Sequence, residues 1–206
     1  MKRIVMMALL ALALPVAAFA GSVDFTNVGG TLAGSSAGLS LTGSQLSEVN
    51  GFNGGGLIQG NLGTLTFSTG ALTSGNLTTG ATFSSAGSSF VITSNGTGGL
   101  PNGILFSGTF TGTITWTENL NCGPNGAVCY TLGGTISGTY YNGQTVNGAT
   151  TQLTFQTGKN GFTGSIPLAS GDTVIATSTV PEPGTLGLLG TGLVGLAGVV
   201  RRKLKA

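Results

Sequence analysis

The stretch from Phe106 to Thr117 constrains the fold most, because apolar and polar residues alternate along it. Its large apolar residues stand at even positions, and threonine fills every odd position from Thr109 onward. Successive side chains of a β-strand point to opposite faces, so a period of two predicts a strand with one buried face. The predicted buried set is Phe106, Phe110, Ile114 and Trp116, and the predicted exposed set includes Thr109, Thr111, Thr113 and Thr115.

The same period recurs along the chain. Residues 130–141 form a second alternating run, so 106–117 and 130–141 predict a hairpin, and 149–157 predicts a third strand. Weaker candidates cover 22–26, 38–42, 64–68, 89–94, 162–166 and 173–177, with loops expected between 27 and 63. Many short strands separated by turns predict an all-β fold, a single antiparallel β-sandwich or jelly-roll-like domain. The alternative is a β-solenoid, for which no sustained repeat period is found.

Residues 1–20 have the layout of a secretory signal peptide. Two basic residues precede an apolar run over 4–16, which is followed by Ala18-Phe19-Ala20. We expect signal peptidase to cleave after Ala20, which leaves residues 21–179 as an extracellular domain rich in Gly, Ser and Thr. The alternative is an uncleaved N-terminal anchor, for which the apolar run is short.

Two cysteines, Cys122 and Cys129, enclose the turn-forming sequence Gly-Pro-Asn-Gly. In an exported chain, two cysteines this close predict a disulfide. Matching of the apolar faces pairs residues of equal parity across the predicted hairpin, but these two cysteines differ in parity. A bulge is therefore expected, or at least one cysteine outside the ladder.

The composition changes again at residue 180, and residues 180–206 form a separate tail. Pro181, Glu182 and Pro183 make a stiff stretch that resists helix formation. The uncharged run over 185–200 would be about 24 Å long as a helix, against a hydrocarbon core of ~30 Å. A basic cluster then ends the chain, with Arg201, Arg202, Lys203 and Lys205. Because positive residues stay cytoplasmic, the tail predicts a C-terminal transmembrane helix with the body outside.

This order of Pro-Glu-Pro, glycine-rich apolar run and terminal basic cluster resembles the PEP-CTERM sorting domain, and the resemblance is confined to the tail. It implies a Gram-negative bacterium that makes exopolysaccharide, and an exosortase that recognises Pro181–Pro183 and removes the tail. It also implies a transient membrane anchor, followed by a place on the cell surface or outside the cell. A related tail is named after an ice-binding protein. The alternative is a plain C-terminal anchor, for which the apolar run is again short.

The composition removes most catalytic chemistry. The chain has no histidine, which excludes a Ser-His-Asp triad and His-ligated metal sites. The body carboxylates Asp24, Glu48, Glu118 and Asp172 are scattered in sequence, and no motif groups them into a glycosidase pair. Basic residues gather at the two ends of the chain, so no groove for nucleic acid is expected. The sequence therefore predicts no enzyme, no metal and no cofactor.

Together these patterns predict an exported, non-catalytic protein of the cell surface or extracellular matrix. Signal peptidase and an exosortase are its expected processing partners, the membrane is a transient partner, and exopolysaccharide is a further candidate. The alternative is a carbohydrate- or ice-binding module that uses the exposed threonine face over 109–115.

Overall fold

A computed structural model describes residues 21–123, 127–157 and 161–177 of the chain, which form one compact unit over 21–177. In this part the regular structure is β-strand, with two short 3₁₀ turns, η1 (Phe52–Gly54) and η2 (Thr97–Gly99). The strands are β1 (Gly21–Val28), β2 (Thr31–Ser35), β3 (Gly38–Asn50), β4 (Ile58–Ser68), β5 (Leu72–Asn76), β6 (Gly80–Phe83), β7 (Ser89–Asn95), β8 (Asn102–Gly123), β9 (Ala127–Tyr140), β10 (Thr145–Gln156) and β11 (Ser165–Thr177).

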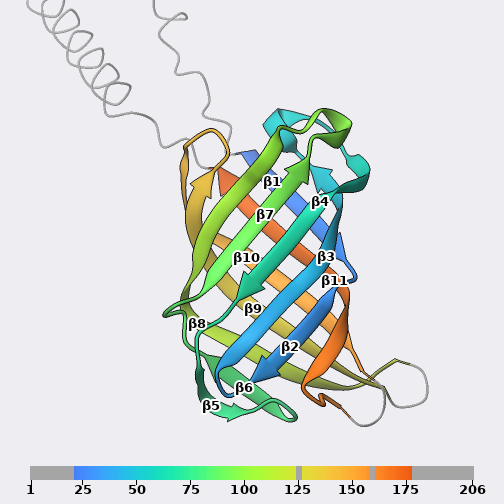
Figure 1. Cartoon of the computed structure of the whole chain (residues 1–206), viewed down its shortest axis with the longest axis vertical. Coiled ribbons are helices and arrows are strands. Elements are labelled where there is room, and N and C mark those ends of the chain that lie inside the picture. Colours follow the sequence, from blue (N-terminus) through green and yellow to red (C-terminus); the bar gives the residue numbers. More distant parts are fainter. Residues whose placement is uncertain (1–20, 124–126, 158–160, 178–206) are drawn as a thin grey trace, which may run out of the picture. The chain divides into compact units, whose positions relative to one another are not determined.

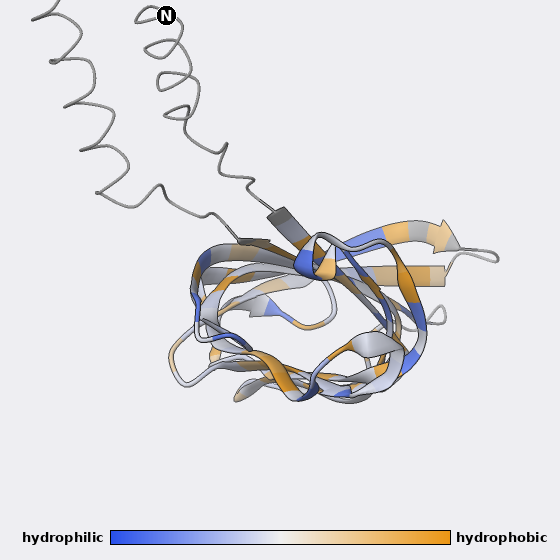
Figure 2. Ribbon diagram, turned by 90° about the horizontal axis from the view of Figure 1, so that it is seen from above, coloured by the Kyte–Doolittle hydropathy of each residue, from blue (hydrophilic) through white to orange (hydrophobic). Residues whose placement is uncertain are grey.

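The strands belong to a single antiparallel sheet that closes on itself (Figure 1). Around the ring the order is β1, β3, β4, β7, β8, β9, β10 and β11, and β11 pairs again with β1. β2 follows β1 along the chain and occupies the same place in the ring, between β3 and β11. The β5–β6 hairpin is attached through β6, which pairs with the second half of β8. Seen along its axis, the sheet forms a continuous ring (Figure 2).

The all-β, antiparallel prediction is confirmed, but the prediction of a β-sandwich or jelly roll is wrong. The described residues form one closed sheet, and neither two packed sheets nor solenoid coils are present among them. A period of two shows only that one face is buried. It does not distinguish burial against a second sheet from burial inside a ring formed by the same sheet.

Most predicted strands are present. The hairpin is confirmed as β8 and β9, the third strand as β10, and five weaker candidates fall within β1, β3, β4, β7 and β11. The sixth, 162–166, overlaps only the start of β11. The loops expected between 27 and 63 are largely replaced by β2 and β3, and the short strands β2, β5 and β6 were not predicted. Their glycines and few apolar residues give only a weak sequence pattern for a strand. These segments become strands because they pair with neighbouring strands of the sheet.

Apolar side chains occupy the interior of the ring. Phe106, Phe110, Ile114 and Trp116 are buried as the period predicted. The ring of Trp116 stacks on Tyr130, with 4.7 Å between centroids. The turn between β5 and β6 covers this end, because the Trp116 Nε1 donates to the Leu77 carbonyl at 3.0 Å and the Tyr130 hydroxyl donates to the Thr78 carbonyl at 2.8 Å.

Glycine supplies room for large interior side chains. A Cβ on Gly134 would lie 2.8 Å from Cδ1 of Phe110, and one on Gly34 would lie 2.9 Å from Cζ of Phe162. These distances are shorter than real Cβ contacts, so the two aromatic rings occupy the space that side chains would need.

The predicted disulfide is present between Cys122 and Cys129, whose Cα atoms are 5.9 Å apart. Cys129 stands opposite Asn119 in the β8–β9 ladder, and the register shifts between Asn119 and Gly123. The parity argument is confirmed, because the irregularity places Cys122 outside the regular pairing.

The signal peptide predicted over 1–20 and the sorting tail, with Pro181, Glu182, Pro183 and the basic cluster, lie outside the described residues. Within the described residues, no helix combines the length and apolar character that a membrane span requires.

Candidate functional site on the outer threonine face

The exposed threonines lie on the outer face of β8, β9 and β10. Thr109, Thr111, Thr113 and Thr115 are all exposed. The ladders align them with partners on the next strands in transverse rows. One row contains Thr117, Thr131 and Thr154, a second contains Thr115, Gly133 and Gln152, and a third contains Thr111, Thr135 and Thr150. The threonine face therefore extends over three strands, where the sequence pattern indicated one or two.

A bulge interrupts this face at Gly112 and Thr113. Thr111 pairs with Thr135 and Thr115 pairs with Gly133, so three residues of β8 stand opposite the single residue Gly134 of β9. Gly112 has a φ of 74°, which glycine adopts without steric cost. The threonine row is thus not the uninterrupted array that strict alternation predicted, and Thr113 lies outside the ladder.

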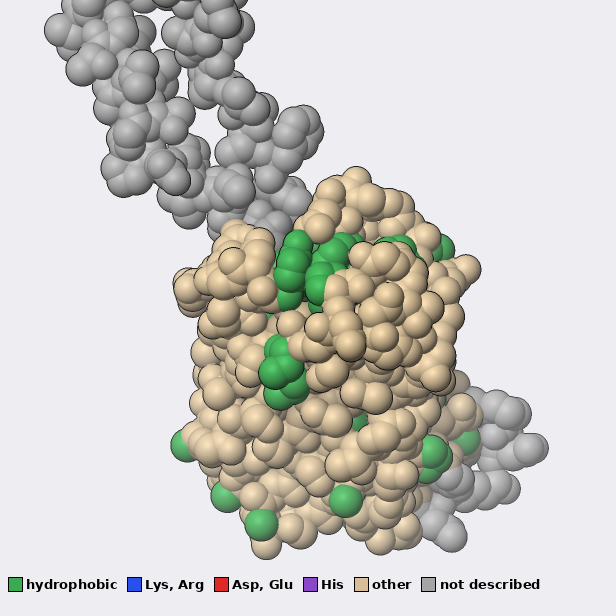
Figure 3. Space-filling model, turned by 45° about the horizontal axis from the view of Figure 1, so that its top comes forward, with side chains coloured by type: hydrophobic (Ala, Val, Ile, Leu, Met, Phe, Trp, Pro, Cys, Tyr) green, Lys and Arg blue, Asp and Glu red, His purple; other side chains and the backbone are tan. Residues whose placement is uncertain are grey.

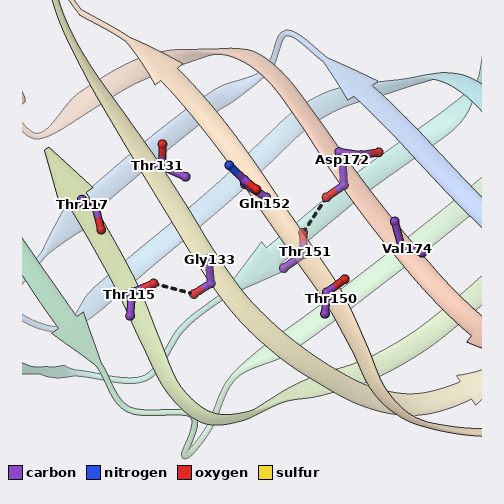
Figure 4. A pocket seen from close by; sticks show the side chains of 9 residues that line it. All are labelled: Thr115, Thr117, Thr131, Gly133, Thr150, Thr151, Gln152, Asp172 and Val174. Atoms are coloured by element: carbon purple, nitrogen blue, oxygen red, sulfur yellow. Dashed lines mark hydrogen bonds between the residues drawn. The ribbon is translucent and has the colours of Figure 1, made fainter. Parts of the chain in front are cut away.

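A shallow depression of about 350 Å³ lies on the outer face beside Gly133 (Figure 4). Gly133 leaves a gap in the second row, between the side chains of Thr115 and Gln152. The Thr115 hydroxyl donates to the Gly133 carbonyl at 3.2 Å, which holds that side chain at the rim. The lining residues are Thr115, Thr117, Thr131, Gly133, Thr150, Thr151, Gln152, Asp172 and Val174. The site is polar and contains hydroxyl, amide and carboxyl groups.

Three of the four body carboxylates meet beside this depression, although the sequence analysis treated them as scattered. Asp24 of β1 and Asp172 of β11 lie on the outer face one pairing step apart, since Asp24 pairs with Val174 and Asp172 pairs with Thr26. Glu48 of β3 pairs with Thr26 from the other side. The pairing of the first strand with the last brings these residues together, and no local sequence signal reports it.

The Asp24 carboxyl is electrostatically strained. No hydrogen-bond partner reaches its buried Oδ1, and the described residues contain no lysine or arginine. A hydrogen bond with the Asp172 carboxyl is the largest cause that raises the pKa of Asp24 from 3.8 to about 7. Burial and repulsion from Asp172 and Glu48 add to the rise. Two carboxyls can share a hydrogen bond only while one of them keeps a proton.

This geometry suits hydrogen bonding better than bond cleavage. A glycosidase pair faces its substrate from two sides with a gap of at least ~5 Å, whereas Asp24 and Asp172 lie side by side on one face of the sheet. Among the described residues, no group of three His, Cys, Asp or Glu side chains is placed to hold a metal ion.

The fold and the site define a closed antiparallel sheet with a hydroxyl-rich outer face, followed by a tail of different composition. Residues 179–203 match the family model described as the PEP-CTERM protein-sorting motif, which confirms the resemblance and its restriction to the tail. The motif implies export and processing by an exosortase at the membrane. No curated protein and no solved structure matches this chain.

Proposed function

We propose that this chain is an exported, non-catalytic surface or matrix-associated protein, delivered by a signal peptide and released from its tail by an exosortase. The observation that carries the proposal is the sorting motif at 179–203. Pro181, Glu182 and Pro183 act as the recognition sequence of a substrate. Arg201, Arg202 and Lys203 stop transfer at the cytoplasmic side.

Two features of the body support a non-catalytic role. Its interior is occupied by a continuous apolar core, which leaves the outer face to contact ligands. The depression on that face lacks histidine and free thiol, and its one carboxyl group, that of Asp172, lies beside the Asp24 carboxyl on the same face. Covalent catalysis requires a nucleophile with a base within hydrogen-bond reach. The lining residues offer no histidine or thiol for such a pair, which supports the proposed non-catalytic role.

Intact mass of the exported protein tests the processing. We expect an N-terminus at Gly21 and loss of the segment that ends in Ala206. Glu182→Gln should make the full tail persist, whereas the matched variant Glu118→Gln, in β8, should be processed normally. A surface-isolated parent protein that retains residues 201–206 would refute exosortase processing and indicate a permanent anchor.

The depression favours a second candidate, a carbohydrate-binding module. Sugars present arrays of hydroxyl groups, and the depression offers donors and acceptors from Thr131, Gln152 and Asp172. Ice is less well matched, because the bulge at Gly112–Thr113 and the gap at Gly133 break the regularity that an ice lattice requires.

A glycan array followed by titration with the best-binding oligosaccharide tests this candidate. Gly133→Val should fill the depression and abolish binding, because a Cβ there lies 3.2 Å from the Thr115 hydroxyl. Gly56→Val is the matched control, since its Cβ would meet nothing within 4 Å. Binding that survives Gly133→Val, or activity confined to an ice-recrystallisation assay, would exclude the depression as a sugar site.

A further inference from the structure

One end of the closed sheet exposes apolar side chains. Leu57, which follows η1, is 55% exposed, and Ile104, near the start of β8, is 57% exposed. This end lies at the top of Figure 1, and hydrophobic side chains reach the surface there in Figure 3. Ile58 pairs with Val49, and the space beside Gly98 of η2 is filled by Ile58, so η1, η2 and the start of β4 belong to the same end.

The connections at this end carry no charged side chain. The connections over 51–57, 96–101 and 141–144 contain no Asp, Glu, Lys or Arg. Transfer of a loop into a lipid interface is opposed mainly by charged groups, so their absence matters more than the number of apolar residues.

Aromatic contacts hold these connections in place. The ring of Phe52 in η1 lies 5.2 Å from that of Tyr141, and the Tyr141 hydroxyl donates to Asn53 Oδ1 at 2.9 Å. The Tyr141 backbone N–H also donates to the Leu105 carbonyl, next to Ile104. Ile104 therefore adjoins a bonded backbone carbonyl, and Leu57 directly precedes Ile58, which is paired in the β3–β4 ladder.

Both ends of the described unit lie at this apolar end. Gly21 pairs with Thr177, and Gly51 packs against the Ser22 backbone beside η1. Thr185, where the apolar run of the tail begins, is eight residues beyond Thr177. Eight extended residues span at most about 28 Å. While the tail remains in the membrane, the apolar end is tethered within that distance of the lipid.

We propose that the end of the sheet formed by η1, η2 and the 141–144 turn rests on the lipid surface while the tail is intact, with Leu57 and Ile104 as its contact residues. This inference depends on the membrane anchoring in the proposed function. Two side chains give weak affinity alone, but a short tether makes the contact intramolecular and raises its occupancy. Removal of the tail ends that advantage, so the mature body leaves the membrane. The contact is thus specific to the unprocessed chain.

Brominated lipids test the proposal in the full-length precursor, reconstituted into phosphatidylcholine vesicles. Leu57→Trp and Ile104→Trp place fluorescent reporters at the proposed contact, and Leu120→Trp is the control. Leu120 is 67% exposed near the hairpin tip of β8 and β9, at the other end of the sheet. The buried Trp116 is common to all variants, and its signal is subtracted with the parent protein.

We expect brominated lipid to quench the reporters at 57 and 104 several-fold more than the reporter at 120, and we expect this difference to disappear in the tail-cleaved protein. Equal quenching at all three positions, in a precursor that sediments with the vesicles, would overturn the contact and leave the anchoring intact. A precursor that fails to sediment with vesicles would overturn both the contact and the anchoring. Persistent quenching after removal of the tail would overturn the dependence on the tether.

Discussion

Replacement of Asp24 by asparagine should stabilise the protein at alkaline pH. Asp24 lies on the seam between β1 and β11, beside Asp172 and near Glu48, with no basic residue in the described chain to offset them. Asparagine keeps the shape of the side chain, carries no charge and can donate a hydrogen bond to the Asp172 carboxylate. The variant therefore removes the repulsion and keeps the contact.

The direction follows from the raised pKa. Because the folded-state pKa of Asp24 is about 7 and its ordinary value is 3.8, the folded protein holds a proton that the unfolded chain has released over that range. The contribution of Asp24 to the stability is then most favourable below about pH 4 and is lost as the pH rises through about 7. The full shift would correspond to ~4 kcal/mol at ~1.4 kcal/mol for each pKa unit. Asp24 is only half-buried, so solvent screening reduces our expectation to about 1 kcal/mol.

Urea unfolding of the parent protein and of Asp24→Asn, at pH 4.5 and pH 8, measures this effect. The parent should lose about 1 kcal/mol between the two values, and the variant should change less and exceed the parent at pH 8. Glu118→Gln is the control, because Glu118 lies on β8 away from the seam. A parent protein that becomes more stable towards pH 8, or an Asp24→Asn variant that is weaker there, would refute the shared-proton interpretation.

Three further predictions concern packing and the disulfide. Trp116→Ala should cost about 3–5 kcal/mol in urea unfolding, the usual range for an emptied aromatic site, whereas Thr113→Ser should change stability by less than about 1 kcal/mol; the reverse order would mean that the buried and exposed faces are misassigned. Gly134→Val should lower the free energy of unfolding by about 1–3 kcal/mol, because the new side chain overpacks against Phe110. An unchanged unfolding midpoint would show that the Phe110 side chain has room to move. Alkylation without reductant should label neither Cys122 nor Cys129, and reduction should cost about 2 kcal/mol on the loop-closure model; labelled thiols in the exported protein would contradict the bond.

The features that could be predicted from the sequence are those that a local pattern of residues encodes. Alternation over 106–117 identified β8 and its buried face, and parity across the hairpin predicted a bulge or at least one cysteine outside the ladder; in the structure that cysteine is Cys122. The order of residue types in the tail was enough to identify the sorting motif.

The features that escaped prediction depend on contacts distant in sequence. The ring closes through the pairing of β1 with β11. This pairing brings together Asp24 and Asp172, which stand 148 positions apart in the chain. The depression depends on the absence of a side chain at Gly133, flanked by Thr115 of β8 and Gln152 of β10. A glycine in a glycine-rich chain is not distinctive until its neighbours on adjacent strands are known.

The charges around the depression also restrict which glycan the second candidate function would accept. Asp172 lines the depression, Asp24 and Glu48 lie next to it, and the described residues offer no lysine or arginine to attract an anion. An acidic polysaccharide would bring its carboxylates towards these three carboxyl groups, and like charges repel each other. A neutral sugar avoids the repulsion and can donate hydroxyl hydrogens to Asp172, since a carboxylate is a strong acceptor. Neutral oligosaccharides should therefore bind more tightly than uronic acid oligosaccharides of the same length, and added salt should narrow the difference because it screens the repulsion. A preference for the acidic series at low salt would place any glycan site elsewhere on the molecule.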